Sequence, residues 1–357
     1  MTRTLATLAL ATASLVGCGD DPTYEPWQLE TLQGNAGFSL RVPEFEVPSG
    51  RESQNCYFVQ VPDVDGGNDL FVNRVVTAIN PGSHHVNVFR VKTIINLDPT
   101  AGTPVQLGDY PATLIEGSDD YATNPCWDSA NWADWPLVAN SQHSEADNPI
   151  TDWQLPPTVA IRFTPGEMLM LQTHYVNTTD QPTDFGARVG INFYNDTATA
   201  THMEMGSLFA TQQNIRICQS NPQVTYSGTC RFPNAVTVAA ANGHFHKRGS
   251  DFRIYSWDGL SADHPADTTM FYESTAWDHP LMERDLAVSQ PANTGIWWDC
   301  GYQWQQPDVF TCDDVNAKDP QQAGDCCYTF GGNTDVGEHC NVFLYYYPKV
   351  DSDVFCL

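Results

Sequence analysis

Short runs of β-forming residues constrain the fold of this 357-residue chain more than any other feature. Apolar and polar side chains alternate in several runs, as in half-buried strands, and helical periodicity is scarce. Clusters of Pro, Gly, Asn and Asp, such as Asn80-Pro81-Gly82 and Pro165-Gly166-Glu167, separate the runs as turns. The clearest runs span residues 56–61, 86–91, 159–163, 168–172, 189–193, 236–240 and 342–347. We therefore expect an all-β sandwich architecture.

The length is sufficient for two domains of ordinary size, each with its own core. We expect a tether over residues 19–36, a first domain over 37–200 and a second over 201–357. The segment 108–148 is rich in Trp, Asp and Asn, which predicts an ordered excursion rather than core strands.

The N-terminus is typical of an export signal. Arg3 precedes an apolar run from Leu5 to Leu15 that is too short to span a bilayer. Residues 15–18 resemble a bacterial lipobox cut before Cys18, which would then carry lipid; a plain signal peptide cut elsewhere is the alternative. We expect an exported bacterial lipoprotein, anchored to a membrane at the periplasm or cell surface.

Cysteine usage agrees with export. The chain has 11 cysteines, so removal of Cys18 leaves ten, an even number that can all pair in an oxidising compartment. The adjacent Cys326 and Cys327 cannot easily pair with each other, and no CxxC spacing indicates zinc. A disulfide framework is therefore expected.

The formal net charge of -27 argues against nucleic acid as a partner, because it repels phosphate backbones. It would also oppose binding to anionic membrane surfaces. No single acidic block dominates, so we interpret the charge as a solvated surface.

Six of the ten histidines occur in four short motifs. They are His84 and His85 in HHVNVF, His174 in LQTHY, His244 and His246 in GHFH, and His339 in EHC. Imidazole is a common ligand of copper and zinc, so two groups of three would furnish two metal sites.

Each histidine motif also has a structural interpretation. Adjacent strand residues face opposite sides, so His84 and His85 can bind one ion only where the backbone departs from a regular pleat; the alternative is a surface turn. His174 alone could be a hydrogen-bonded structural residue. The spacing of His244 and His246 puts both on one strand face, which suits either a metal or a structural pair.

The order of these motifs resembles that of the copper type II, ascorbate-dependent monooxygenases. This family includes peptidylglycine alpha-hydroxylating monooxygenase and dopamine beta-monooxygenase. The resemblance extends from about Phe38 to Cys356 and includes the run LPPTVAIRFTPGE ahead of His174. It implies two tandem jelly-roll-like β-sandwich domains with disulfides, each holding one copper across a solvent-filled cleft.

By the same resemblance, His84, His85 and His174 form an electron-transfer copper site. His244, His246 and His339 form the catalytic-type site, except that the family has methionine where this chain has His339. A thioether favours cuprous copper, whereas imidazole is harder, so this exchange bears on activity more than on metal binding. Met270 or Met282 supplying the thioether from a loop is the alternative.

The resemblance also implies substrate contacts at Asn242, Asn341 and Phe343. The peptidylglycine enzymes have Arg, Asn and Tyr at these three positions. Only the Asn, at Asn341, is the same here, and Asn242 stands where the family Arg would pair with a peptide carboxylate. We do not expect peptide amidation, and Phe343 indicates a less polar substrate, with packing as the alternative role. Gln172 and Tyr175 flank His174 as in the family and could orient ligands or serve structure.

Disulfides are the last implication of the resemblance. It pairs Cys56 with Cys126 and Cys300 with Cys340, and Cys356 with either Cys218 or Cys230. Cys312, Cys326 and Cys327 have no assigned partner.

The expected function is hydroxylation of a C–H bond in a small organic substrate, with two coppers per chain, O2 and ascorbate or another one-electron reductant. The alternative is a non-catalytic cell-surface copper-binding protein on the same fold, which His339 favours. A third interpretation treats the histidines as surface decoration without stoichiometric metal. We expect a monomer.

Overall fold

The computed structural model describes most of the chain, and this part is built almost entirely of strands. The described residues are 29–80, 82–94, 98, 100–117, 134–142, 150–177, 186–278, 280, 282–308, 310–316, 324–350 and 354–356. Short helices occur only at η1 (Gly34–Ala36), η3 (Asp267–Thr269) and α2 (Cys312–Asn316) among them. The expected all-β class is confirmed, and no described helix has the length and apolar character needed to cross a bilayer.

The first unit consists of two six-stranded sheets. Sheet A contains β1 (Gly37–Glu46), β3 (Leu70–Ile79), β8 (Ile150–Gln154), β9 (Val159–Phe163), β11 (Gly186–Asn195) and β12 (Met203–Glu204). Sheet B contains β2 (Glu52–Gln60), β4 (Ser83–Arg90), β5 (Thr103–Leu107), β6 (Tyr110–Ile115), β7 (Leu137–Ser141) and β10 (Met168–Val176).

The second unit consists of three sheets. Sheet C contains β13 (Gly206–Thr211), β16 (Val236–His244), β19 (Met282–Glu283), β20 (Val288–Gln290), β24 (Asn341–Tyr347) and β25 (Val354–Cys356). Sheet D contains β15 (Gln223–Arg231), β17 (Gly249–Trp257), β18 (Met270–Ser274) and β21 (Gly295–Gln303). The small sheet E contains β14 (Arg216–Cys218), β22 (Cys327–Phe330) and β23 (Gly337–Glu338).

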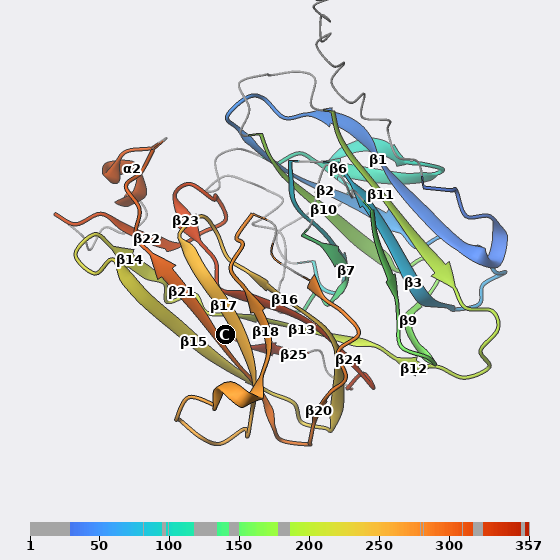
Figure 1. Ribbon diagram of the computed structural model, residues 1–357. Helices are drawn as coiled ribbons and strands as arrows, with labels where there is room; N and C mark the ends of the chain where they lie inside the picture. The colour runs from blue at the N-terminus through green and yellow to red at the C-terminus, as the bar shows by residue number, and fades with distance from the viewer. Residues whose placement is uncertain are drawn as a thin grey trace, which may run out of the picture.

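The chain follows the same route twice. In the first unit β1-β11-β3-β9 lies opposite β2-β10-β4-β7, and in the second β13-β24-β16-β20 lies opposite β15-β21-β17-β18. The expectation of two tandem jelly-roll-like domains is not confirmed beyond the all-β class. The added strands, and sheet E in particular, make five sheets instead of the four of two plain sandwiches. Figure 1 shows the blue-to-green first unit beside the yellow-to-red second unit.

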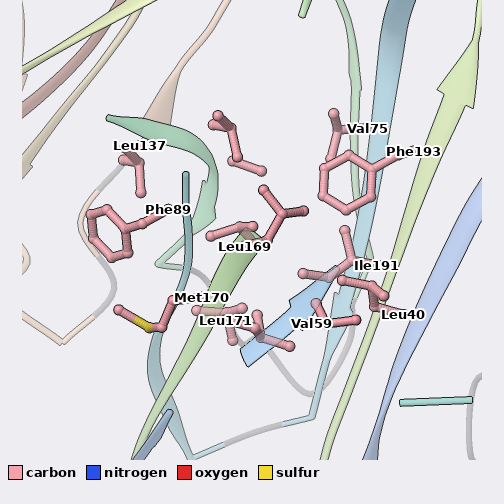
Figure 2. Close-up of a cluster of buried hydrophobic side chains, with 14 of the residues drawn as sticks. Leu40, Val59, Val75, Phe89, Leu137, Leu169, Met170, Leu171, Ile191 and Phe193 are labelled. Carbon is pink, nitrogen blue, oxygen red and sulfur yellow. The ribbon is translucent and has the colours of Figure 1, made fainter. Parts of the chain in front are cut away.

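Strand alternation gives sheet B two buried faces. Leu169 and Leu171 point toward Val75 of β3 and the rest of the first core, whereas Met170 and Phe89 lie on the other side of β10 (Figure 2). That other side meets the second unit, because Phe343 and Tyr345 of β24 belong to the same apolar cluster as Phe89 and Met170. The functional motifs of the first unit therefore face its neighbour.

One expectation about the segment 108–148 is wrong. The structure places β6 and β7 in this segment, and both pair within sheet B, with β2 and β4 respectively. Residues 118–133 and 143–149 lie outside the described residues. At the other end of sheet A, part of the expected tether is bound to the first unit: Arg41 donates to the carbonyls of Leu29 and Glu30, and Leu32 is buried.

Four disulfides stabilise the second unit. The expected Cys300–Cys340 bond is present, and the partner of Cys356 is Cys230. The two adjacent cysteines pair elsewhere, as Cys218–Cys327 and Cys312–Cys326. Cys18 and Cys126, the expected lipidated cysteine and the expected partner of Cys56, lie outside the described residues.

Candidate metal centre

The first three histidines come together on two neighbouring strands of sheet B. His85 of β4 lies opposite His174 of β10, and the next residue of β10, Tyr175, lies opposite Ser83. His84 is thus an extra residue in β4 and forms a β-bulge, which is the departure from regular pleating that two adjacent ligands require. His84 and His85 are buried, at 3% and 5% exposure, so the surface-turn interpretation of this pair is wrong.

The second three histidines lie at the end of sheet C. His244 is the last residue of β16 and pairs with Asn341, the first residue of β24. Phe245 enters the core of the second unit, so alternation returns His246 to the side of His244. His339 lies two residues before Asn341, beside the Cys300–Cys340 disulfide that joins β21 to this segment.

The two triplets form one buried cluster, which differs from the solvent-filled cleft that the resemblance implied. The ring centroids of His84 and His244 are 5.0 Å apart, and those of His85 and His244 are 5.3 Å apart. Within the second triplet, the rings of His246 and His339 are 4.3 Å apart. All six rings therefore share one environment between the units.

Burial keeps five of these imidazoles neutral. None of the six is more than 5% exposed. Burial, together with the neighbouring imidazoles, lowers the pKa well below the usual 6.5 in His84, His85, His244 and His246. Burial also lowers the pKa of His339 to about 3. A neutral imidazole keeps a lone pair on one nitrogen, which is the form that binds metal.

Oxygen acceptors fix the tautomer of His174. Its Nε2 lies 2.9 Å from Oε2 of Glu52, so this nitrogen donates its N–H and Nδ1 is the atom that faces the other histidines. That Nδ1 lies 3.3 Å from Nε2 of His85. Burial alone would raise the pKa of Glu52, but hydrogen bonds with His174 and Thr334 lower it, which keeps the carboxylate ionised.

The same logic applies to His244 and His246. Nδ1 of His244 donates to Oε1 of Gln142 at 3.1 Å, and Nδ1 of His246 donates to the Gly337 carbonyl at 3.2 Å. Each Nε2 is left with a lone pair, and that of His244 lies 3.1 Å from Nδ1 of His339. Metal-binding histidines commonly use their second nitrogen in this way.

The residues present fit a metal ion. Nε2 of His246 makes no hydrogen bond to a described group. The ligand atoms of His84, His85 and His174 lie within 4.8 Å of one another, as do those of His84, His244 and His246. Tetrahedral coordination at about 2.0–2.1 Å places ligand nitrogens about 3.3 Å apart, close to the His174–His85 and His244–His339 separations.

The imidazole-only donor set suits copper or zinc. The two methionines considered as alternative ligands have other surroundings. Met282 pairs with Asn242 in sheet C, and its sulfur accepts a hydrogen bond from Arg284 at 3.4 Å. Met270 is 37% exposed.

A cavity of about 130 Å³ lies against the centre. Its lining includes His85, His244 and His339, together with two of the expected substrate residues, Asn341 and Phe343. The third, Asn242, is fully buried without lining this cavity, and its side-chain amide donates to the Pro280 carbonyl at 3.4 Å.

The two residues flanking His174 have different roles. Gln172 lines the cavity and accepts a hydrogen bond at 3.1 Å from Asn87, which lies 3.2 Å from Nδ1 of His85. Gln172 therefore helps to position His85 through Asn87. The Tyr175 hydroxyl instead bonds to Asn80 and the Arg188 carbonyl, which ties β10 to sheet A.

Several positioning residues were not expected from the sequence. Glu52 and Gln142 are the acceptors described above. Fully buried Glu338 accepts from the backbone N–H groups of His246 and Arg248, at 3.0 and 2.9 Å, and so holds the turn that carries His246. Glu338 directly precedes His339, which was the one signal that could have drawn attention to it.

Comparison with known proteins identifies no relative. No protein-family model matches the chain, and no curated protein matches it. Among solved structures, the infectious bursal disease virus VP2 subviral particle aligns with 91% of this chain and 80% of that chain, at 11% identity and a TM-score of 0.15. The Gx strain structure of the same virus aligns with 88% and 77%, at 9% identity and a TM-score of 0.15. At such TM-scores neither likeness carries an argument.

Proposed function

We propose that this chain is a copper-dependent monooxygenase that hydroxylates a C–H bond of a small organic substrate, using O2 and a one-electron reductant such as ascorbate. The observation that carries the proposal is the convergence of buried, neutral imidazoles beside a cavity lined by His85, His244 and His339. The sequence resemblance to the copper type II monooxygenases supports the choice of metal and reaction.

Copper, when bound, would supply one-electron redox chemistry in two oxidation states that imidazole accommodates. The reaction would insert one oxygen atom of O2 into the substrate and release the other as water, with two electrons and two protons from the reductant. The protein residues hold and shield the site. Glu52, Gln142 and the Gly337 carbonyl fix three imidazoles, and burial between the units excludes water from the ligands.

The test is reconstitution of the purified protein with copper, followed by measurement of bound copper and of ascorbate-dependent O2 uptake. We expect stoichiometric copper and hydroxylated product equal to the O2 consumed. Zinc-loaded protein is the matched control, because zinc accepts the same ligands but has no redox chemistry. Absence of stoichiometric copper would overturn the proposal.

The second candidate is a non-catalytic copper-binding protein. It is favoured by His339, whose Nδ1 lies 3.1 Å from Nε2 of His244 at the position where the resembled family has a thioether. The cavity against the centre favours the enzyme, because a storage site needs no space for a second molecule. Copper binding without oxygen uptake, with any of several reductants, would select the binding protein.

His339→Met tests how far this ligand sets the chemistry. A thioether favours cuprous copper, so we expect a higher reduction potential at unchanged copper stoichiometry. Potentiometric titration measures the change, and an unaltered potential would show that His339 does not contact the metal. The lipid anchor expected at Cys18 would place either activity at a membrane surface.

A further inference from the structure

The cavity beside the histidines has aromatic walls from both units. Phe89 of β4 lines it together with Phe209, Phe330 and Phe343 of the second unit. The rings of Phe209 and Phe343 stack with centroids 5.2 Å apart, and Phe330 lies 4.9 Å from the ring of His339. Flat apolar walls of this kind favour a flat apolar guest.

The described residues of the cavity lining carry no charged side chain. Apart from the phenylalanines and three histidines, the described lining residues are Asn87, Gln172, Gln213 and Asn341, all uncharged. An ammonium or carboxylate would lose its hydration there without gaining a partner.

Three buried amide groups in the lining still have hydrogen-bonding capacity. Oδ1 of Asn87, Nε2 of Gln172 and Oδ1 of Asn341 make no hydrogen bond to a described group, and the three residues are at most 4% exposed. Buried polar groups in proteins are nearly always paired. A guest with one hydroxyl group could satisfy at least one of them, and Asn341 offers an acceptor at the second-unit side of the cavity.

We propose that this cavity binds a neutral, single-ring aromatic molecule that carries one hydroxyl group, the class of simple alkylphenols. The size limits a guest to a single ring, because the cavity measures about 130 Å³ and an apolar cavity of about 150 Å³ holds one benzene molecule. The inference rests on the proposed function in that such a molecule would be the substrate.

Calorimetric titration of the purified protein, metal-free and copper-loaded, tests the inference with four ring compounds. We expect 4-methylphenol to bind about tenfold more tightly than toluene, because toluene leaves the amide unpaired. In the metal-free protein, benzoate and benzylamine should bind at least a hundredfold more weakly than 4-methylphenol. Charged compounds that bind the metal-free protein as tightly as 4-methylphenol would overturn the inference.

Two variants locate the binding site. Asn341→Leu should reduce the affinity for 4-methylphenol to that for toluene and leave toluene binding unchanged. Phe343→Trp fills the cavity and should weaken both, whereas the control Phe271→Trp, at a partly buried position outside the lining, should weaken neither. If Asn341→Leu keeps the preference for the phenol, the assigned acceptor is wrong.

The outcomes separate this inference from the proposed function. Tight binding of 4-methylphenol without any copper-dependent product supports the cavity assignment and counts against the enzyme. Copper-dependent hydroxylation of a charged substrate, with no affinity for neutral aromatics, supports the enzyme and overturns the cavity assignment.

Discussion

The two histidine triplets present the same side-chain chemistry but are held differently. In the first unit His85 and His174 face each other on paired strands, with His84 added by a bulge. In the second unit His246 lies beyond a strand end, on a turn held by Glu338, and His339 lies beside a disulfide. Regular pairing positions the first triplet, whereas specific polar and covalent contacts position the second.

The triplets also differ in charge. His174 donates to the carboxylate of Glu52, but His244 and His246 donate to an uncharged amide and a backbone carbonyl. A carboxylate partner makes an imidazole a stronger base and ligand. If both triplets bind metal as proposed, the first should therefore hold its ion more firmly than the second, whose ligands have uncharged partners.

The largest expected effect comes from His84, the residue that the two groups of metal-ligand atoms share. His84→Ala should lower bound copper by at least half, because a ligand is lost from both groups. His264→Ala is the control, since the side chain of His264 is 45% exposed and pairs with Asp299 away from the centre. Copper is measured by atomic absorption, and an unchanged stoichiometry would break the idea of a shared ligand.

A smaller effect should separate the two triplets. Glu52→Gln should weaken copper binding about 10- to 100-fold, because the ionised acceptor of His174 is lost. Gln142→Ala should weaken it less, since Gln142 is uncharged and His246 keeps its own acceptor. Competition with a copper chelator gives both affinities, and equal losses would contradict the electrostatic difference.

The smallest expected effect concerns the exposed His264. Its pKa is raised, whereas the pKa values of five buried histidines in the centre are lowered. A hydrogen bond to Asp299 raises the pKa of His264 above 6.5. The folded state therefore binds this proton more tightly, and its stabilisation is full below pH 6.5 and is lost as pH rises through the raised pKa. Solvent screening limits the loss to less than about 1 kcal/mol.

Unfolding midpoints measured between pH 6 and pH 9 check this sign. Wild type should lose stability relative to His264→Gln as pH rises through that interval. A constant difference between the two proteins would show that the Asp299 contact does not couple to protonation.

The sequence was most informative where structure follows local pattern. The run 159–163 is a strand with those bounds, β9, and the other apolar runs lie within or overlap described strands. The requirement that the backbone depart from its pleat at His84 was also readable from adjacency alone, and the bulge meets it. The segment 108–148 misled because its Trp, Asp and Asn content hid two short strands: β6, which pairs with its neighbour β5 and with β2, and β7, which pairs with β4.

The partners of the histidines were not readable from the sequence. Glu52 lies far from His174 along the chain and Gln142 far from His244, and neither stands in a recognisable motif. The Glu52–His174 contact forms when β2 pairs with β10 in sheet B, and the Gln142–His244 contact forms only when the first unit packs on sheet C. A polar residue in a loop or at a strand end gives no local signal of which imidazole it will meet.

The sequence by itself determined the strands, the imidazole donor set and the side of each strand on which the ligands lie, because alternation and side-chain chemistry are local properties. Only the tertiary structure decided that the two triplets meet in one buried centre, where the rings of His84 and His244 are 5.0 Å apart. The two triplets come together because two whole sheet faces pack on each other through many side chains, including Phe89, Phe343 and Tyr345. No single sequence motif contains the information about such packing.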